Sequence, residues 1–444
     1  MIEVAEKRTP YAEDFSRSEK TLQGHSLPWL KDLRRSAINR FMELGLPTDR
    51  HEEWRFTNVK PIAQTIFQEP GMRWPNNFNV GSFKDLTFKG LESLSLVFVN
   101  GRYAPEFSSI PTTLPDGVRI ASLAALITSR PQQIEPHLGH YADFERQAFT
   151  ALNTAFFSDG AFIYLSQGIV LDTPIHLLFL SGPGTEPIQM HPRILVVAEP
   201  GSQASIIEDH AGLGKGIYFS NSVTEVVLGE NARIDHYKIE RESPEAYHIS
   251  TLQVHQERAS RFTSHAVLLG GALVRNNINV TLDAEGAECS LNGLYVATGH
   301  QHLDTHTLID HAKPHGTSRE LYKGVLDEAA KAVFNGQVIV RADAQKTDSV
   351  QTNKNLLLSD NARVDTKPEL KIFANDVKCK HGATIGQIDP EAIFYLRSRG
   401  IDAQKARQLL IHAFASDMIN RLEVAPLKEG LSALLSNKLK NGSR

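Results

Sequence analysis

The chain of 444 residues carries 47 basic and 51 acidic side chains, so its formal net charge is −4. This balance argues against a nucleic-acid or anionic-membrane partner, because such binding needs a basic surface. No apolar run reaches the ~18 residues of a spanning helix, and the first residues lack the apolar segment of a secretion signal. The length allows one long domain with appendages as well as several domains.

Cysteines are scarce in this sequence. There are only two, Cys289 and Cys379, too few for a disulfide framework in a chain of this size. Their scarcity indicates a reducing compartment, and we expect a soluble, cytoplasmic protein. Cys289 shares its side of a predicted strand with Ala287 and Leu291, which predicts a core position for its thiol.

The N-terminal region, residues 1–155, is expected to be mixed and partly helical. A helix is predicted from Pro28 to Gly45, because Gly45 is followed by Pro47 and apolar residues recur at helical spacing at Trp29, Leu30, Leu33, Ala37, Ile38 and Phe41.

Residues 156–388 have the texture of an all-β region. Short apolar runs such as AFIYL, IHLLFL and NNINVTL are separated by turns, and Phe334, Gly336, Val338 and Val340 alternate. Period alone does not separate a sandwich, a propeller and a β-helix. A coiled β-solenoid is favoured because small or amide residues recur near the expected turns, at Gly229, Asn231, Asn276, Asn277, Gly293, Asn335 and Asn361.

Residues 389–444 return to helix. Asp389-Pro390-Glu391 is a typical helix start, Gly400 can end that helix, and Asp402 can cap a second one. The predicted buried stripe of the second helix is Ala406, Leu410, Ala413, Phe414 and Met418.

Familiar catalytic signatures are absent from the sequence. It has no Walker-type phosphate loop, no G-x-G-x-x-G between a strand and a helix, and neither G-x-S-x-G nor H-E-x-x-H. We therefore expect no unaided ATP hydrolysis. Two functions remain open for a β-helical chain of this kind. One is a polysaccharide-active β-helix enzyme that uses paired carboxylates, and the other is a self-associating structural β-helix without a metal role.

Two segments carry candidate metal ligands, of which the first is rich in histidine. His300, His302, His306, His311 and His315 fall within sixteen positions. Their spacing matches no standard zinc pattern and no cysteine is near, so a structural role is favoured over metal binding.

The second segment is NDVKCKHGATIG, in which Cys379 and His381 alternate with Lys378 and Lys380. In a strand, the thiol and the imidazole would project from one face about 7 Å apart. This pair suits iron, zinc or a nascent cluster, but two ligands leave the coordination sphere incomplete. The lysines are expected to lower the thiol pKa. An equally open interpretation makes Cys379 a packing residue and His381 part of the Gly382 turn.

Long segments resemble the SufB/SufD family of iron-sulfur cluster assembly proteins. The resemblance covers Lys346–Ile401, which ends in ANDVKCKHGATIGQIDPEAIFYLRSRGI, together with LGLPTDRHEEWRFT (Leu44–Thr57), LGGALVRNNINVTLDAEGAECSLNGLY and His311–Val340. The K-C-x-H-G-A-T-x-G run is similar to SufD-type members. Asn355 stands where SufB-type members carry a cysteine, and His381 replaces their acidic-histidine segment.

The resemblance implies a right-handed parallel β-helix with helical N-terminal and C-terminal regions. It implies a non-catalytic scaffold subunit that pairs with SufB along the segment of Cys379 and His381. The ATPase SufC would dock on residues 389–444. Iron or a nascent cluster would be bound transiently and shared with SufB, with none held tightly by the isolated chain. His381 is then the stronger metal-ligand candidate and Cys379 the weaker, the sulfur-accepting cysteine belongs to SufB, and the isolated chain can homodimerise.

Overall fold

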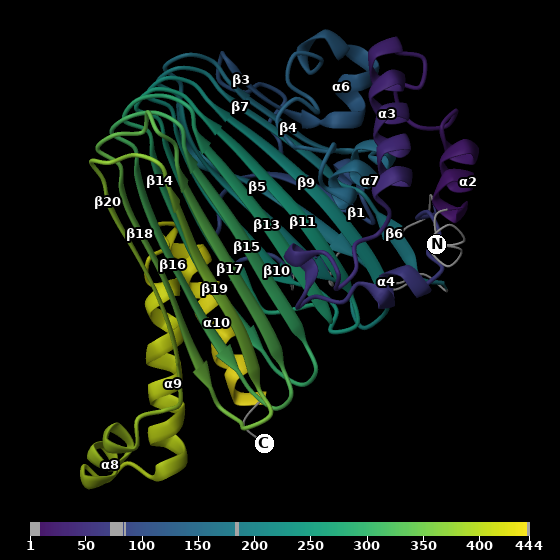
Figure 1. Cartoon of the computed structure of the whole chain (residues 1–444). Coiled ribbons are helices and arrows are strands. Elements are labelled where there is room, and N and C mark those ends of the chain that lie inside the picture. The colour runs from purple at the N-terminus through teal and green to yellow at the C-terminus, as the bar shows by residue number, and fades with distance from the viewer. Residues whose placement is uncertain (1–8, 72–82, 84–85, 183–185, 442–444) are drawn as a thin grey trace.

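The structure is a computed structural model that describes residues 9–71, 83, 86–182 and 186–441. A long double-sheeted β-solenoid forms the body of the molecule, with helices on both sides of it (Figure 1). The predicted fold class, a mainly β parallel solenoid flanked by N-terminal and C-terminal helices, is confirmed. No described helix is long and apolar enough to cross a membrane.

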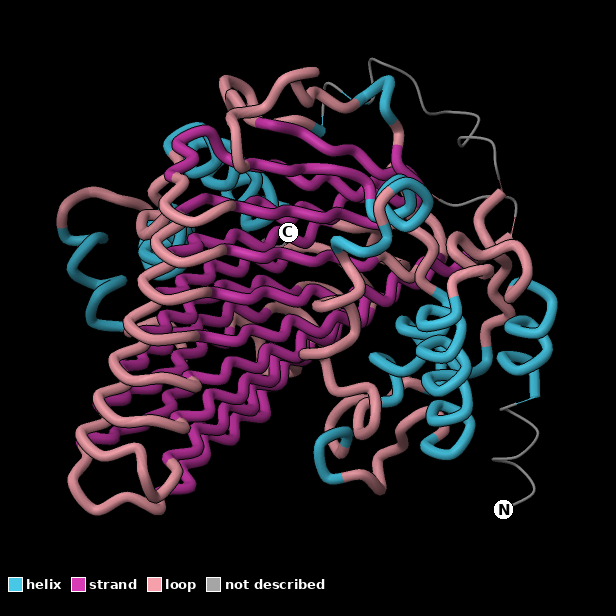
Figure 2. Tube along the Cα trace, turned by 90° about the horizontal axis from the view of Figure 1, so that it is seen from above, coloured by secondary structure: helices cyan, strands magenta, loops and turns pink. Residues whose placement is uncertain are grey.

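The solenoid is made of two sheets. Within each sheet, neighbouring strands run parallel to one another and stack along the length of the solenoid. From β8 onward, consecutive strands alternate between the two sheets, and each strand pairs with the strand two places further along the chain. Figure 2, seen from above, shows successive turns stacked on one another along the solenoid. One sheet contains β5 (Val170–Ser181), β8 (Gln203–Gly212), β10 (Arg233–Arg241), β12 (Arg261–Leu268), β14 (Glu288–Ala297), β16 (Thr317–Leu326), β18 (Asp348–Leu357) and β20 (Lys378–Gly386).

The facing sheet contains β4 (Gly160–Leu165), β7 (Arg193–Ala198), β9 (Tyr218–Leu228), β11 (Tyr247–Gln256), β13 (Leu273–Leu282), β15 (His302–His311), β17 (Lys331–Val340) and β19 (Arg363–Ile372), and β6 (Ile188–Met190) pairs with β9. The N-terminal region adds β1 (Leu94–Val99), β2 (Arg102–Tyr103) and β3 (Val118–Ser122). Of these, β1 extends the first sheet in parallel beside β5, whereas β3 pairs antiparallel with β4.

Alternation along each strand separates an inner face from an outer face. In β14, Cys289, Leu291 and Tyr295 point inward and belong to the core between the sheets, while Leu294 and Val296 belong to a second apolar cluster outside. Parallel register then stacks equivalent positions into rows, so Cys289 lies beside Ser318 of β16. The predicted core position of Cys289 is confirmed, with a thiol-bearing side chain 1% exposed.

The turn residues that favoured a solenoid are only partly turn residues. Gly229, Asn231 and Asn361 do lie between strands, and Asn231 adopts a left-handed backbone with φ 58°. The other residues of that set, however, lie inside strands: Asn276 and Asn277 in β13, Gly293 in β14 and Asn335 in β17. Gly293 is needed there because an added Cβ would meet the Tyr322 ring at 2.1 Å.

The N-terminal helices cover the outer face of the β9-containing sheet. They are α2 (Thr9–Ser18), α3 (Pro28–Leu44), α4 (Lys60–Gln64), α6 (Leu123–Ser129) and α7 (Ala148–Phe156). The predicted helix is α3, which starts at a proline and ends before Gly45, where φ is 65°. Its apolar face joins α7 and the outward side chains of Phe219, Ile249 and Leu273 in one cluster.

The C-terminal helices are α8 (Pro390–Ser398), α9 (Ala403–Ile419) and α10 (Ala425–Asn441). The predicted caps are present, since the side chain of Asp389 accepts from Glu391 N and that of Asp402 from Lys405 N. The predicted stripe of α9 was partly wrong: its buried residues are Ala406, Ile411, Ala415, Met418 and Ile419. The buried residues differ from the predicted stripe because α9 lies between α10 and the outer face of β14 and β16. Two sides of the helix are therefore shielded from solvent.

Truncation of a leucine in the inner core should destabilise the protein far more than truncation of an exposed leucine. Leu291 is fully buried between the sheets, whereas Leu409 is 45% exposed on α9. Leu291→Ala should lower the free energy of unfolding by about 2–5 kcal/mol, and Leu409→Ala by no more than about 0.5 kcal/mol. Urea denaturation of both variants measures this, and equal effects would contradict the inward assignment of Leu291.

Candidate functional site

The segment of Cys379 and His381 forms the last strand of its sheet. Strand β20 pairs with β18 on one side only, and this pairing sets Cys379 beside Ser349 and His381 beside Gln351. Ser349 and Gln351 are buried, inward-facing residues. Cys379 and His381 therefore continue two inward rows and share one face of β20, as their spacing predicts.

This end of the solenoid is open. Most of β20 is exposed, and β19 is likewise the last strand of the other sheet, although every earlier turn is largely buried. Cys379 is half-buried and packs against the inner core, while His381 is exposed. The chain thus brings the two predicted ligands together at an uncovered rim. Within the described residues, no third histidine, cysteine or carboxylate joins them closely enough to complete a metal site.

The expectation that Lys378 and Lys380 lower the Cys379 pKa was wrong. Partial burial raises the pKa of this thiol above its ordinary value, and Asp348 adds to the increase. The lysines occupy the other face of the strand, because side chains alternate, so their charges do not offset burial. Burial raises the pKa of the Cys289 thiol still further.

The five clustered histidines separate in the fold. His302 Nε2 lies 2.9 Å from Thr57 Oγ1, His306 Nε2 lies 3.1 Å from Asp304 Oδ1, and His311 Nε2 lies 2.9 Å from Ser318 Oγ. The first two face the N-terminal region and the third faces the interior. They form no common site in the described residues, so the structural interpretation fits them.

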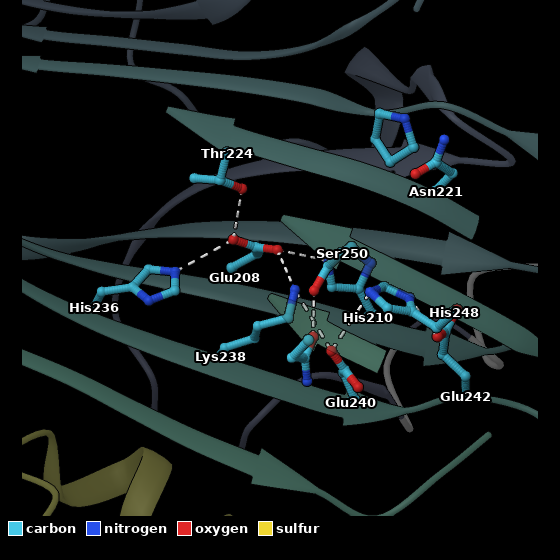
Figure 3. Close-up of polar contacts among 12 residues, drawn as sticks. Glu208, His210, Asn221, Thr224, His236, Lys238, Glu240, Glu242, His248 and Ser250 are labelled. Carbon is cyan, nitrogen blue, oxygen red and sulfur yellow. Dashed lines mark hydrogen bonds and ion pairs between the residues drawn. The ribbon is translucent and has the colours of Figure 1, made fainter. Parts of the chain in front are cut away.

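A buried polar cluster lies between the sheets, and the sequence analysis missed it (Figure 3). At its centre, the Glu208 carboxylate accepts from Lys238 Nζ at 2.6 Å and from Thr224 Oγ1 at 3.1 Å. Its two other neighbours are His210 Nε2 at 2.9 Å and His236 Nε2 at 3.2 Å. Glu208 is therefore fully satisfied although its side chain is only 2% exposed.

Next to Glu208 lies a second group of buried polar side chains, which makes few hydrogen bonds. His248 Nδ1 lies 2.7 Å from Glu242 Oε2, and His248 Nε2 lies 3.4 Å from Glu240 Oε1. The rings of His210 and His248 meet edge to face with centroids 4.7 Å apart. Lys238 Nζ also lies 3.5 Å from Glu240 Oε1, but within the described residues no carboxylate oxygen of Glu240 or Glu242 makes a hydrogen bond, and His210 Nδ1 also lacks one.

The charges in this group influence one another strongly. Burial opposes ionisation of Glu242, but His248, His210 and Lys238 hold the pKa of its carboxyl below the ordinary value. Burial also opposes the charged form of His248, yet Glu240 and Glu242 raise the pKa of its imidazole. Burial and the nearby Lys238 lower the pKa of His210 despite its contact with Glu208.

A signal for this cluster was present in the sequence. Charged residues occupy alternate positions in two strands, at Glu208 and His210 in β8 and at His236, Lys238 and Glu240 in β10. On each strand these positions continue an inward apolar row that begins at Ala204 or Ile234. Charged residues in an otherwise apolar inward row indicate a buried polar site.

Comparison with known proteins matches two family models to this chain, and the boundary between them falls within β5. A family model for the SufBD core domain of the SUF system for FeS cluster assembly matches residues 180–414. A second model, for the SufBD protein N-terminal region, matches residues 5–177. The chain belongs to the SufBD family.

Individual SufBD relatives match along almost the whole chain. An iron-sulfur cluster assembly SufBD family protein of Synechocystis is 36% identical over 415 residues, covering 92% of this chain and 90% of that protein. Iron-sulfur cluster assembly protein SufD of Escherichia coli is 32% identical over 410 residues and 92% of each chain. The SufD of Bacillus subtilis is 26% identical over 430 residues, covering 93% of this chain and 94% of its own. This SufBD protein is thus SufD-like and takes part in SUF-system cluster assembly.

The two thiols of this SufBD protein should react very differently. Half-buried Cys379 should alkylate in the native chain, whereas buried Cys289 should alkylate only after unfolding. Because the Cys379 pKa is raised, its rate should keep increasing with pH beyond the value of about 8.5 at which an ordinary thiol is half ionised. Peptide mass spectrometry after timed iodoacetamide exposure measures both rates. Rapid native labelling of Cys289 would contradict this arrangement.

Proposed function

We propose that this chain is the SufD-type scaffold subunit of a SUF assembly complex. It pairs with SufB through the open end of the solenoid, binds the ATPase SufC through its C-terminal helices, and has no catalytic activity of its own. The observation that carries the proposal is the uncovered last turn, which holds His381 and Cys379 at its inner rim. The cytoplasmic location expected from the sequence is part of this proposal.

The open end supports pairing with a second β-helix. In a parallel solenoid, the final strands leave a row of backbone N–H and C=O groups without a ladder partner. Exposed apolar side chains accompany this row, since Ile372 is 40%, Phe373 65% and Ile385 50% exposed. A partner with a matching final turn would continue both sheets and cover these side chains.

Such a pairing would also complete the ligand sphere at the rim. His381 supplies an exposed imidazole and Cys379 a neighbouring thiol, two donors that suit iron or a nascent cluster. We expect His381 to be the stronger ligand, because its nitrogens are accessible, while the raised pKa of Cys379 keeps that thiol protonated near neutral pH. Iron or cluster is then cargo that SufB and this chain hold together and release.

The C-terminal helices support a separate docking surface for SufC. On α8, Phe394 is 72% and Tyr395 59% exposed, and Leu409 of α9 is 45% exposed. The helices α9 and α10 also cover an apolar outer face that includes Tyr237, Ile239 and Leu294. Deleting residues 402–444 would uncover that face, so point variants on α8 test SufC binding more cleanly than truncation.

The alternatives have less support. A polysaccharide-active enzyme needs an accessible carboxylate pair, whereas the carboxylates Glu208, Glu240 and Glu242 that gather in this fold are buried. A structural β-helix that pairs with a second copy of itself would use the same open end. We expect that homodimer when SufB is absent, and displacement of the second copy by SufB.

The rim ligand is tested by substitution in the assembled complex. In chains co-expressed anaerobically with SufB and SufC, His381→Ala should reduce bound iron and sulfide severalfold, because one of two local donors is lost. Lys380→Ala, on the opposite face of the same strand, is the matched control and should retain normal content, as should Cys289→Ala. Iron and sulfide analysis of the purified complexes decides, and unchanged content in His381→Ala refutes the ligand assignment.

The two docking surfaces are tested by a reciprocal pair of variants. Phe394→Asp on α8 should abolish retention of SufC while leaving SufB bound, because it charges only the helical surface. Phe373→Asp at the open end should weaken SufB pairing and leave SufC bound. Pull-down from co-expressing cells measures both partners, and loss of both from either single variant would contradict two separate surfaces.

A further inference from the structure

The poorly satisfied half of the buried cluster offers a set of metal-binding donors. His210, Glu242 and His248 each present a ligand atom, and these atoms all lie within 4.8 Å of one another. Ligands that share one ion at about 2.1 Å lie within about 4.2 Å of one another. Small rotations about side-chain torsions would therefore bring these three ligand atoms close enough to share one ion. Glu240 lies beside it, with Oε1 3.4 Å from His248 Nε2.

The hydrogen bonding of His210 favours the ligand role. Its Nε2 faces Glu208 Oε1 at 2.9 Å, which places the proton on Nε2 and leaves the Nδ1 lone pair free. That Nδ1 is buried and has no hydrogen-bond partner in the described residues. A histidine held by a carboxylate through one nitrogen, with the other nitrogen free, has the arrangement typical of metal-bound histidines.

Charge balance also favours a cation. The carboxylates of Glu208, Glu240 and Glu242 are at most 5% exposed as residues. Among the described residues, Lys238 is the only lysine or arginine that forms an ion pair with any of them. Three buried carboxylates and one lysine ammonium group leave two negative charges. These charges must be balanced either by protons or by one divalent ion. Seven buried atoms of this group make no hydrogen bond in the described residues: both oxygens of Glu240 and of Glu242, His210 Nδ1 and both nitrogens of His248.

We propose that this SufBD protein holds a resident divalent transition-metal ion, zinc or ferrous iron, inside its solenoid, bound by His210, Glu242 and His248 with Glu240 alongside. Two imidazoles and carboxylate oxygens are ligands that both ions accept. The ion would link β8, the end of β10 and the start of β11, and so tie the two sheets together (Figure 3). This site is distinct from the rim of Cys379 and His381, and it departs from the expectation that the isolated chain holds no tightly bound metal.

The first test uses the wild-type full chain without any variant. The chain is purified anaerobically, unfolded with a chelator, and refolded with zinc, with ferrous iron or with chelator alone. We expect about one equivalent of metal per chain by elemental analysis and a higher melting temperature than for the chelator-only sample. Cobalt loading should give a visible spectrum without a thiolate charge-transfer band, because the site contains no sulfur. Binding below about a tenth of an equivalent in every arm overturns the proposal.

Variants then locate the ion. Glu242→Gln and His248→Gln should each weaken metal binding by about tenfold or more, because each removes a direct ligand. His311→Gln is the matched control, since His311 is another buried imidazole that faces the interior. The Cys379→Ala/His381→Ala double variant should keep the ion, so loss of the rim function and loss of this site remain distinguishable. Full metal content in Glu242→Gln, or its loss only in the rim double variant, refutes the assignment, and circular dichroism checks that each variant is folded.

Discussion

Except at its ends, each strand of the solenoid exchanges its backbone hydrogen bonds with the strand one turn before it and the strand one turn after it. This parallel ladder is the constraint on which the other features depend. It holds the register constant from turn to turn, so a side chain that points inward in one strand has inward neighbours in the next. The ladder also has to stop somewhere, and at β19 and β20 it leaves backbone groups without a partner.

The constant register places both candidate ligand groups. The rows that hold Ser318 and Ser349 in the interior end at Cys379, and the rows of Glu320 and Gln351 end at His381. The same alternation carries Glu208 and His210 into the interior at the other half of the solenoid. One group therefore lies at an open rim, where a partner can reach it, and the other lies in a sealed interior.

Coverage of the outer faces divides the surface of the protein. The N-terminal region covers the outside of one sheet: the Arg275 guanidinium carbon lies 3.8 Å from the centroid of the Trp54 ring, and Glu225 accepts from the backbone N–H groups of Tyr141 and Ala142. The C-terminal helices seal the outside of the other sheet through α9 and α10. Single apolar side chains such as Ile66 and Val170 are exposed elsewhere, but several lie together at the open end and on α8, the two places where we propose that partners bind.

The sequence by itself determined the alternating strands of the β region, the helix from Pro28, the caps at Asp389 and Asp402, and the shared face of Cys379 and His381. These follow from local rules, because alternation, helical spacing and capping depend on residues a few positions apart. Only the tertiary structure decided that Cys379 is partly buried with a raised pKa, that α9 is covered on two sides, and that His210, Glu242 and His248 converge. Those outcomes depend on which strand stacks beside which, and residues 38 positions apart along the chain meet only when one turn of the solenoid closes on another.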